Sequence, residues 1–203
     1  MLNFQFYSPT EFVFGRETEN QVGELVKRYG GTKVLIHYGG GSVTKSGLYD
    51  RTVKSLEAAG LELVSLGGAK PNPIDTLVYE GIALARREGV DFILGIGGGS
   101  AIDSSKAIAA GVPYEGDFWD FYAGKARLTK TMKLGCIITL PATGTEGSDS
   151  TVITRSDGMF KRGMGSDLNR PLFSIMNPEL TFTLPAYQTA SGIADMMAHI
   201  MER

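Results

Sequence analysis

Short apolar runs alternate with stretches of helical periodicity along the first 140 residues. The runs at 34–36, 61–66, 92–96 and 136–140 have the length and composition of buried strands. Between the runs, apolar positions recur at spacings of three and four, which predicts helices over 19–29, 44–59, 73–88 and 100–110. Alternating strands and helices predict the α/β class, here a Rossmann-like parallel sheet with helices on both of its faces.

Local signals set several expected boundaries. Gly60 and Gly89 are expected to end helices, and Asn72 is expected to cap the third helix with Pro73 in its first turn. Residues 3–14 alternate aromatic and polar positions around Ser8-Pro9, which predicts a β-hairpin. In residues 141–183, glycine, aspartate and proline recur at short intervals, which predicts short strands joined by turns.

A second unit is expected after residue 183. Pro185 opens an apolar helical pattern that continues to Arg203 with no cap, glycine or proline behind it. We therefore expect an NADP-binding α/β domain over 1–183. Residues 184–203 are expected to be the first helix of an all-helical metal-binding domain whose remainder is absent, so the chain is expected to be truncated.

Composition narrows the class of protein. Hydrophobic residues make up 42%, charged residues 21%, and the net charge is −2, so a broad basic face for nucleic acid is not expected. No apolar run approaches the ~20 residues of a membrane span, and the first residues do not resemble a signal peptide. A single cysteine, Cys136, fits a reducing compartment. We expect a cytoplasmic protein that contacts neither membrane nor nucleic acid.

The 27 glycines are clustered, and two clusters are nearly identical. Each follows a predicted strand, and they read Gly39-Gly40-Gly41-Ser42 and Gly97-Gly98-Gly99-Ser100. Ligands of parallel sheets bind beyond the carboxyl ends of the strands, and free N–H groups at a helix start bind anions. The second cluster therefore predicts a pyrophosphate site, with Asp103 and Lys106 following on the same helix. A tight turn without a ligand is the alternative, since neither cluster is a G-x-G-x-x-G fingerprint.

The stretch after the first predicted strand favours NADP over NAD. An acidic residue there would bind a ribose 2′-hydroxyl and repel a 2′-phosphate, but none occurs between Tyr38 and Asp50. Ser42 and Lys45 are available instead. The alternative is that cofactor choice is made elsewhere. His37, at the end of this strand, is expected to be a packed histidine rather than a catalytic one.

Asp195 and His199 lie four residues apart on the last predicted helix, so they share one face. A carboxylate and an imidazole so placed suit Fe²⁺, Zn²⁺ or Mn²⁺. Taken alone, the pair is also typical of an ordinary helix surface. Two ligands are too few for a catalytic metal, which keeps three or four protein ligands.

Three segments together resemble the iron-containing (group III) alcohol dehydrogenase family, of the NADPH-dependent butanol dehydrogenase and aldehyde reductase type. The first is the Tyr38–Val43 glycine turn with Lys70-Pro71-Asn72-Pro73 after it, and the second is the Gly97–Asp103 segment with Lys106. The third is Thr139-Leu140-Pro141-Ala142-Thr143-Gly144-Thr145-Glu146. It is followed by Asn177-Pro178-Glu179-Leu180 and by the helix that carries Asp195 and His199. The resemblance covers essentially the whole chain, which has about half of the family's usual length.

The resemblance implies a role for each matching residue. Gly39, Gly40, Gly41 and Ser42 would face the adenosine ribose and its 2′-phosphate; Gly97, Gly98, Gly99, Ser100 and Asp103 the pyrophosphate and nicotinamide; Thr139, Leu140 and Thr143 the adenine and its ribose; and Lys161 the nicotinamide ribose. Asp195 and His199 match the first two metal ligands, and the family's two remaining histidine ligands are absent. Ser148-Asp149 replaces an asparagine pair common in close relatives, which puts the contacts near the nicotinamide in doubt.

The implied function is hydride transfer between NADP(H) and a small primary alcohol or aldehyde, such as butanol and butanal. Fe²⁺, or alternatively Zn²⁺, would act as Lewis acid, with no catalytic side chain beyond the metal ligands. A homodimer pairing through the N-terminal hairpin is expected. The alternatives are an inert nucleotide-binding fragment and an NAD-dependent enzyme like glycerol dehydrogenase or dehydroquinate synthase. The 203-residue chain alone is expected to be inactive.

Overall fold

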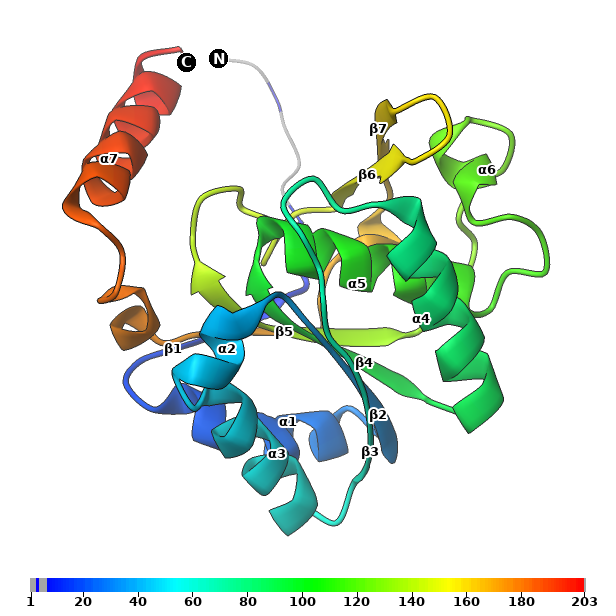
Figure 1. Ribbon diagram of the computed structural model, residues 1–203, viewed down its shortest axis with the longest axis horizontal. Helices are drawn as coiled ribbons and strands as arrows, with labels where there is room; N and C mark the ends of the chain where they lie inside the picture. Colours follow the sequence, from blue (N-terminus) through cyan, green and yellow to red (C-terminus); the bar gives the residue numbers. More distant parts are fainter. Residues whose placement is uncertain (1–2, 4–6, 203) are drawn as a thin grey trace.

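Six parallel strands form the central sheet of the computed structural model, which describes residues 3 and 7–202 (Figure 1). Their spatial order is β1-β8-β5-β4-β2-β3. The strands are β1 (Glu11–Phe14), β2 (Lys33–Tyr38), β3 (Glu62–Leu66), β4 (Phe92–Gly98), β5 (Lys133–Leu140) and β8 (Phe173–Met176). All five neighbouring pairs are parallel, so the predicted α/β class with a Rossmann-like sheet is confirmed.

Helices cover both faces of the sheet (Figure 1). On one side, α1 (Val22–Arg28) and α3 (Leu48–Ala58) pack on β2 and β4 through Val34, Ile36 and Leu94. On the other, α4 (Asp75–Glu88), α5 (Gly99–Gly111) and α6 (Trp119–Tyr122) pack on Leu35 and Ile93. Successive side chains of a strand point to opposite faces, so these buried apolar runs supply two cores at once.

The helix predicted over 44–59 is two helices. α2 (Gly41–Lys45) is separated from α3 by Gly47, which has a φ of 70°. This left-handed conformation interrupts helical hydrogen bonding, and glycine adopts it without strain. The break turns the chain so that α2 stays beside the end of β2. Gly60 (φ +74°) follows Ala59, the C-cap residue of α3, and ends this helical region, as expected.

The predicted cap of α4 is wrong. The helix begins at Asp75 with Ile74 at the cap position, while Asn72 has a φ of 56° and lies in the preceding turn. Pro73 therefore precedes the helix, and its carbonyl accepts a hydrogen bond from the Thr154 amide at 2.8 Å. The other end is as expected, since Gly89 caps the helix with a φ of 65°.

Residues 141–183 contribute to two sheets. β6 (Ser150–Arg155) and β7 (Phe160–Gly165) form an antiparallel hairpin, and β8 enters the main sheet between β5 and β1. The partner of β1 is thus β8, in parallel, rather than a hairpin strand. The expected hairpin partner includes residues 4–6, which lie outside the described residues. Short 3-10 turns, η1 (Thr18–Gln21), η2 (Asp167–Asn169) and η3 (Pro178–Thr181), complete the chain.

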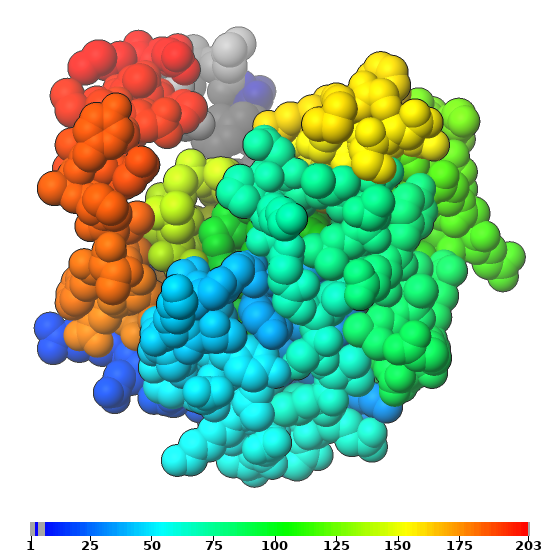
Figure 2. Space-filling view, in the orientation of Figure 1, coloured from blue at the N-terminus to red at the C-terminus, as the bar shows by residue number. Residues whose placement is uncertain are grey.

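Helix α7 (Ala186–Met201) projects away from the sheet, as the orange and red chain shows in Figures 1 and 2. It follows Pro185, as predicted, and none of its residues is buried. Within residues 3 and 7–202, no helix has the length and apolarity needed to cross a membrane.

Candidate functional site

The two glycine turns meet at the carboxyl ends of β2 and β4, which are neighbours in the sheet. A Cβ atom on Gly97 would lie 3.9 Å from the backbone nitrogen of Gly39. Gly98 caps α5 in an extended conformation with no side chain bonded to the free N–H groups. The first turn of this thirteen-residue helix therefore offers unpaired donors and the positive end of the helix dipole to the space above the sheet.

Only some of these glycines are required by the fold itself. Gly97 has a φ of +149°, and a Cβ on Gly99 would lie 2.5 Å from the Thr143 Oγ1, so these two positions exclude a side chain. A Cβ on Gly98 would make an ordinary 3.5 Å contact with Leu140, and one on Gly40 would meet nothing within 4 Å. Packing therefore does not explain why glycine occupies positions 98 and 40, and both residues border the open space above the turns.

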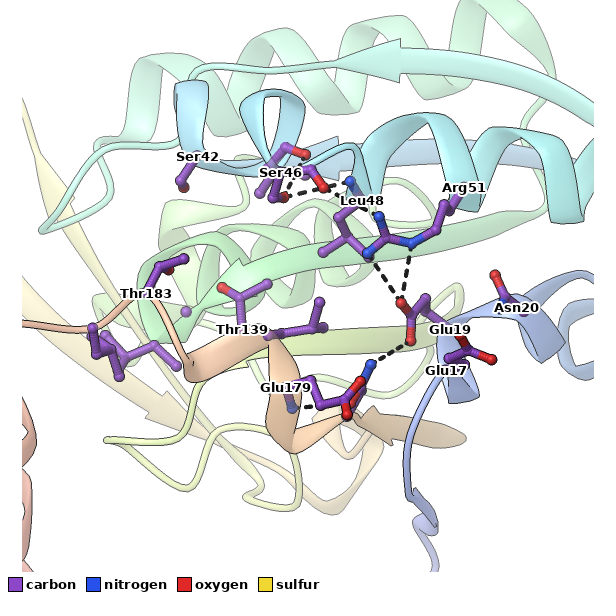
Figure 3. Close-up of a pocket in the computed structure, with 16 residues that line it drawn as sticks. Glu17, Glu19, Asn20, Ser42, Ser46, Leu48, Arg51, Thr139, Glu179 and Thr183 are labelled. Carbon is purple, nitrogen blue, oxygen red and sulfur yellow. Dashed lines mark hydrogen bonds and ion pairs between the residues drawn. The ribbon is translucent and has the colours of Figure 1, made fainter.

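A cleft of about 610 Å³ lies beside these turns (Figure 3). In Figure 2 it corresponds to the hollow between blue α2 and the orange chain of η3. Four of the predicted cofactor residues line it: Ser42, Gly98, Thr139 and Leu140. The other lining residues are Glu17, Glu19, Asn20, Val43, Ser46, Leu48, Arg51, Asn177, Glu179, Leu180, Thr183 and Leu184. Apolar and polar groups together make a cleft of the size and character of small-molecule sites.

An ion pair between the buried Glu19 carboxylate and the partly exposed Arg51 side chain closes one end of the cleft (Figure 3), and the sequence did not reveal it. The Glu19 carboxylate is 2% exposed and accepts hydrogen bonds from Arg51 at 3.1 and 3.2 Å. Asn177 donates to its other oxygen at 2.9 Å. These residues come from η1, α3 and the loop after β8, so no local spacing could have linked them. The pairing neutralises a carboxylate that would otherwise repel an anionic ligand.

The remaining predicted residues lie around the cleft. Asp103 is directed at the segment after β5, where it accepts hydrogen bonds from Thr145 at 2.6 Å and from the Val152 amide at 3.0 Å. Burial raises its pKa. Lys161, on β7, donates to Asn72 at 2.8 Å. Gly41 and Ser100 lie in the first turns of α2 and α5. The cofactor roles of these residues stay predictions.

Asp195 and His199 face the same side of α7, with 3.7 Å between the Asp195 Oδ2 and the His199 Nε2. Both side chains are exposed, at 61% and 72%. Among the described residues, no group of three or more histidine, cysteine, aspartate or glutamate side chains is placed to hold a metal ion. The structure thus places one carboxylate and one imidazole 3.7 Å apart on a helix that stands clear of the cleft, and their metal role stays a prediction.

His37 is a packed histidine, as expected. It is fully buried, its Nδ1 lies 2.9 Å from the Leu66 carbonyl, and its Nε2 lies 2.9 Å from the Ser104 hydroxyl. Burial lowers its pKa to about 4. The ring therefore stays neutral at physiological pH and ties the end of β2 to α5.

This burial predicts a pH-dependent stability. An unfolded histidine binds a proton near pH 6.5 and the folded His37 only near pH 4, so acid favours the unfolded state in this window. We expect the free energy of unfolding to fall by up to about 1.4 kcal/mol per pH unit between 6.5 and 4 from this group. Urea unfolding should show a shallower decline in His37→Gln. Parallel pH profiles of the two proteins would contradict the assignment.

Comparisons with known proteins identify the family of the chain. Residues 9–178 match the family model "Iron-containing alcohol dehydrogenase". NADH-dependent butanol dehydrogenase A of Clostridium acetobutylicum is 45% identical over 202 residues, covering 100% of this chain and 52% of that protein. NADPH-dependent aldehyde reductase YqhD of Escherichia coli is 35% identical over 206 residues, covering 100% and 52%. The chain spans about half the length of the curated relatives it matches.

Solved structures show the same relationship. The crystal structure of NADH-dependent butanol dehydrogenase A from Thermotoga maritima superposes with a TM-score of 0.94 at 46% identity. The match covers 98% of this chain and 50% of that one. Sequence and structure agree along nearly the whole chain, and it belongs to the iron-containing alcohol dehydrogenase family.

Proposed function

We propose that the protein binds NADP(H) in the cleft and takes part in hydride transfer between this cofactor and a small primary alcohol or aldehyde. The observation that carries the proposal is the cleft itself, which opens where two glycine turns and the free N-terminus of α5 meet at the carboxyl edge of the sheet. That position suits a pyrophosphate, and the apolar side chains of Leu140, Leu180 and Leu184 suit a base.

The preference for NADP(H) is the finer part of the proposal. Relatives divide on this point, since butanol dehydrogenase A of C. acetobutylicum is named NADH-dependent and YqhD is named NADPH-dependent. In this chain, a Cβ on Gly39 would make an ordinary 3.6 Å contact with the Ala69 carbonyl, one on Gly40 would meet nothing within 4 Å, and Ser42 and Lys45 are exposed on α2. No carboxylate follows β2 before Asp50, so nothing there repels a 2′-phosphate.

Replacing Gly39 by aspartate should reverse the preference. A carboxylate at this position would repel the 2′-phosphate and accept a hydrogen bond from a free 2′-hydroxyl. We expect NADPH affinity to fall about tenfold, which corresponds to about 1.4 kcal/mol, while NADH affinity is kept or improved. Isothermal titration with both cofactors measures the change. Gly39→Asn, which adds similar volume without charge, is the matched control and should weaken NADPH binding less.

The proposed metal is Fe²⁺ or Zn²⁺, held in part by Asp195 and His199. Their donor atoms lie 3.7 Å apart and suit both cations, so the pair fits one side of a metal site. Completing the coordination requires donors from outside the described residues, because a catalytic metal keeps at least three protein ligands. A bound divalent cation would supply Lewis-acid stabilisation of the alkoxide oxygen. The chain's own share is to bind and orient the cofactor beside that cation.

We propose the domain boundary at residues 183 and 184, since the sheet and its helices end before α7 begins.

We also propose a homodimer. β1 lies at an edge of the sheet, and its Phe12 and Phe14 side chains are 49% and 71% exposed, which suits contact with a second copy.

Cofactor titration tests the core of the proposal. The purified protein should bind NADPH more tightly than NADH, and the bound cofactor should reduce butanal in a metal-dependent assay of the complete enzyme. Tighter binding of NADH would overturn the cofactor preference, and absence of binding by either cofactor would overturn the cofactor site.

A further inference from the structure

We infer that Lys106 is a positioning residue, whose buried ammonium group holds the segment 145–152 against α5 and thereby sets the wall of the cofactor cleft. The inference rests on the proposed cofactor site. Lys106 belongs to the helix that begins at the second glycine turn, about two turns from its start.

The side chain is unusual in being fully buried while charged. Its Nζ donates to the Ser148 carbonyl at 2.9 Å and to the Ser150 carbonyl at 3.0 Å, and it lies 3.3 Å from the Ser148 hydroxyl. An ammonium group has three protons, so the three acceptors satisfy it completely. Two of them are main-chain carbonyls, which makes Lys106 a direct restraint on the path of the backbone.

Asp103 supplies a second restraint, one helical turn before Lys106. Its carboxylate accepts from the Thr145 hydroxyl and the Val152 amide, and its carbonyl accepts from the Thr151 hydroxyl at 2.8 Å. Asp103 holds the two ends of the segment by accepting hydrogen bonds, and Lys106 holds its middle by donating them. The glycine turn and the two tethers are therefore parts of a single helix.

The tethered segment continues directly from the cleft wall. Thr139 and Leu140 at the end of β5 line the cleft, and Thr143 lies so close to Gly99 that a Cβ there would be 2.5 Å from its hydroxyl. Residues 141–144 are exposed, so little packing restrains them apart from this contact. Releasing the segment at 148–150 would let Thr143 move relative to the start of α5.

Titratable groups from α5, β5 and the tethered segment face Lys106. Asp103 lies on the same helix, Cys136 on β5, and Glu146 and Asp149 in the tethered segment. Burial lowers the pKa of Lys106 to about 8, against the smaller opposite effect of Asp103. Burial also raises the pKa of Cys136 to about 12, so this thiol stays protonated and uncharged while Lys106 titrates.

Lys106→Met tests the role directly, because methionine fills much of the volume and donates no hydrogen bond. We expect the dissociation constant of NADPH to rise about tenfold and amide exchange across 145–152 to accelerate, with exchange in β2 and β4 unchanged. Lys130→Met is the matched control. Lys130 is exposed and precedes the amino-terminal end of β5, whereas the cleft lies at the carboxyl ends of the strands. The NADPH dissociation constant and the amide exchange of Lys130→Met should therefore stay at wild-type values.

The wild-type protein provides a second test that does not depend on a variant folding. Between pH 7 and 9.5 Lys106 loses its proton, and NADPH affinity should fall with it. The unfolded lysine keeps that proton up to about pH 10.5. Because the unfolded state then binds more protons than the folded state, the contribution of Lys106 to the free energy of unfolding rises as the pH rises above about 8. Affinity and stability should thus move in opposite directions, which a merely structural lysine would not produce.

The outcomes separate the two proposals. Failure of the wild-type protein to bind NADPH or NADH would overturn the proposed function. If the wild type binds but Lys106→Met binds equally well with its fold intact, the positioning role alone is overturned. A wild-type affinity that is constant from pH 7 to 9.5 would overturn it too.

Discussion

Under the proposed function, replacing His199 by alanine should lower the rate of alcohol oxidation about a thousandfold and remove the bound metal, while NADPH binding is nearly unchanged. His199 and Asp195 lie on the same side of α7 with 3.7 Å between their side chains, and removing the imidazole leaves Asp195 as the one proposed ligand on this helix. Lewis-acid stabilisation of an alkoxide contributes several kcal/mol, and about 4 kcal/mol corresponds to a factor of about a thousand in rate.

Metal analysis, steady-state rates and cofactor titration on the same preparation measure the three effects. Gln188→Ala is the matched control, because Gln188 is exposed on the same helix and is not a proposed ligand. Full metal content in His199→Ala, together with wild-type rates, would remove this residue from the metal site.

Gly98→Ala should weaken NADPH binding about a hundredfold without disturbing the fold. Gly98 caps α5 in an extended conformation open to any residue, and its new methyl group would make only an ordinary 3.5 Å contact with Leu140. That methyl group would project into the cleft where the pyrophosphate approaches the helix N-terminus. A hundredfold loss corresponds to about 2.7 kcal/mol, the scale of losing close contacts with a charged ligand.

A substitution at Gly99 would not test the ligand contact, since its side chain would overlap with Thr143 and distort the turn itself. Gly165→Ala serves as the control. Gly165 is the last residue of β7, and its added methyl group would make an ordinary 3.6 Å contact with the Asp149 carboxylate. An unchanged dissociation constant in Gly98→Ala, with a native circular dichroism spectrum, would show that the turn has no close ligand.

Much of the sheet could be predicted from the sequence because its inner strands β2, β4 and β5 are buried on both faces. Runs such as Phe92–Gly98 are apolar throughout and are followed by glycine, a pattern that survives without knowledge of the rest of the chain. The start of α4 was missed because Asn72 takes a left-handed turn, and Pro73 then hydrogen-bonds to the β6–β7 hairpin. That conformation depends on a partner about 80 residues away, which no local cap signal contains.

The candidate site was predicted only where it is local. Ser42, Gly98, Thr139 and Leu140 follow strands directly, and the structure places them along one cleft. The Glu19–Arg51 ion pair was missed because its members come from η1 and α3, 32 residues apart. The hydrogen bond from Asn177 to the same carboxylate forms only when the segment after β8 is in place. The contacts of Lys106 could not be predicted either, since two of its three acceptors are backbone carbonyls, whose positions do not depend on residue type.

The strand order also constrains how the protein is made on the ribosome. β1 is among the first structure to emerge, yet its partner β8 lies far along the chain, and the contact between Glu19 and Asn177 spans 158 residues. At roughly 5–20 residues per second, translation leaves β1 unpaired for on the order of ten seconds. During that interval Phe12 and Phe14 form an exposed, aromatic strand edge of the kind that recruits chaperones or aggregates. Synthesis rate therefore bears on the yield of this fold as well as its thermodynamic stability.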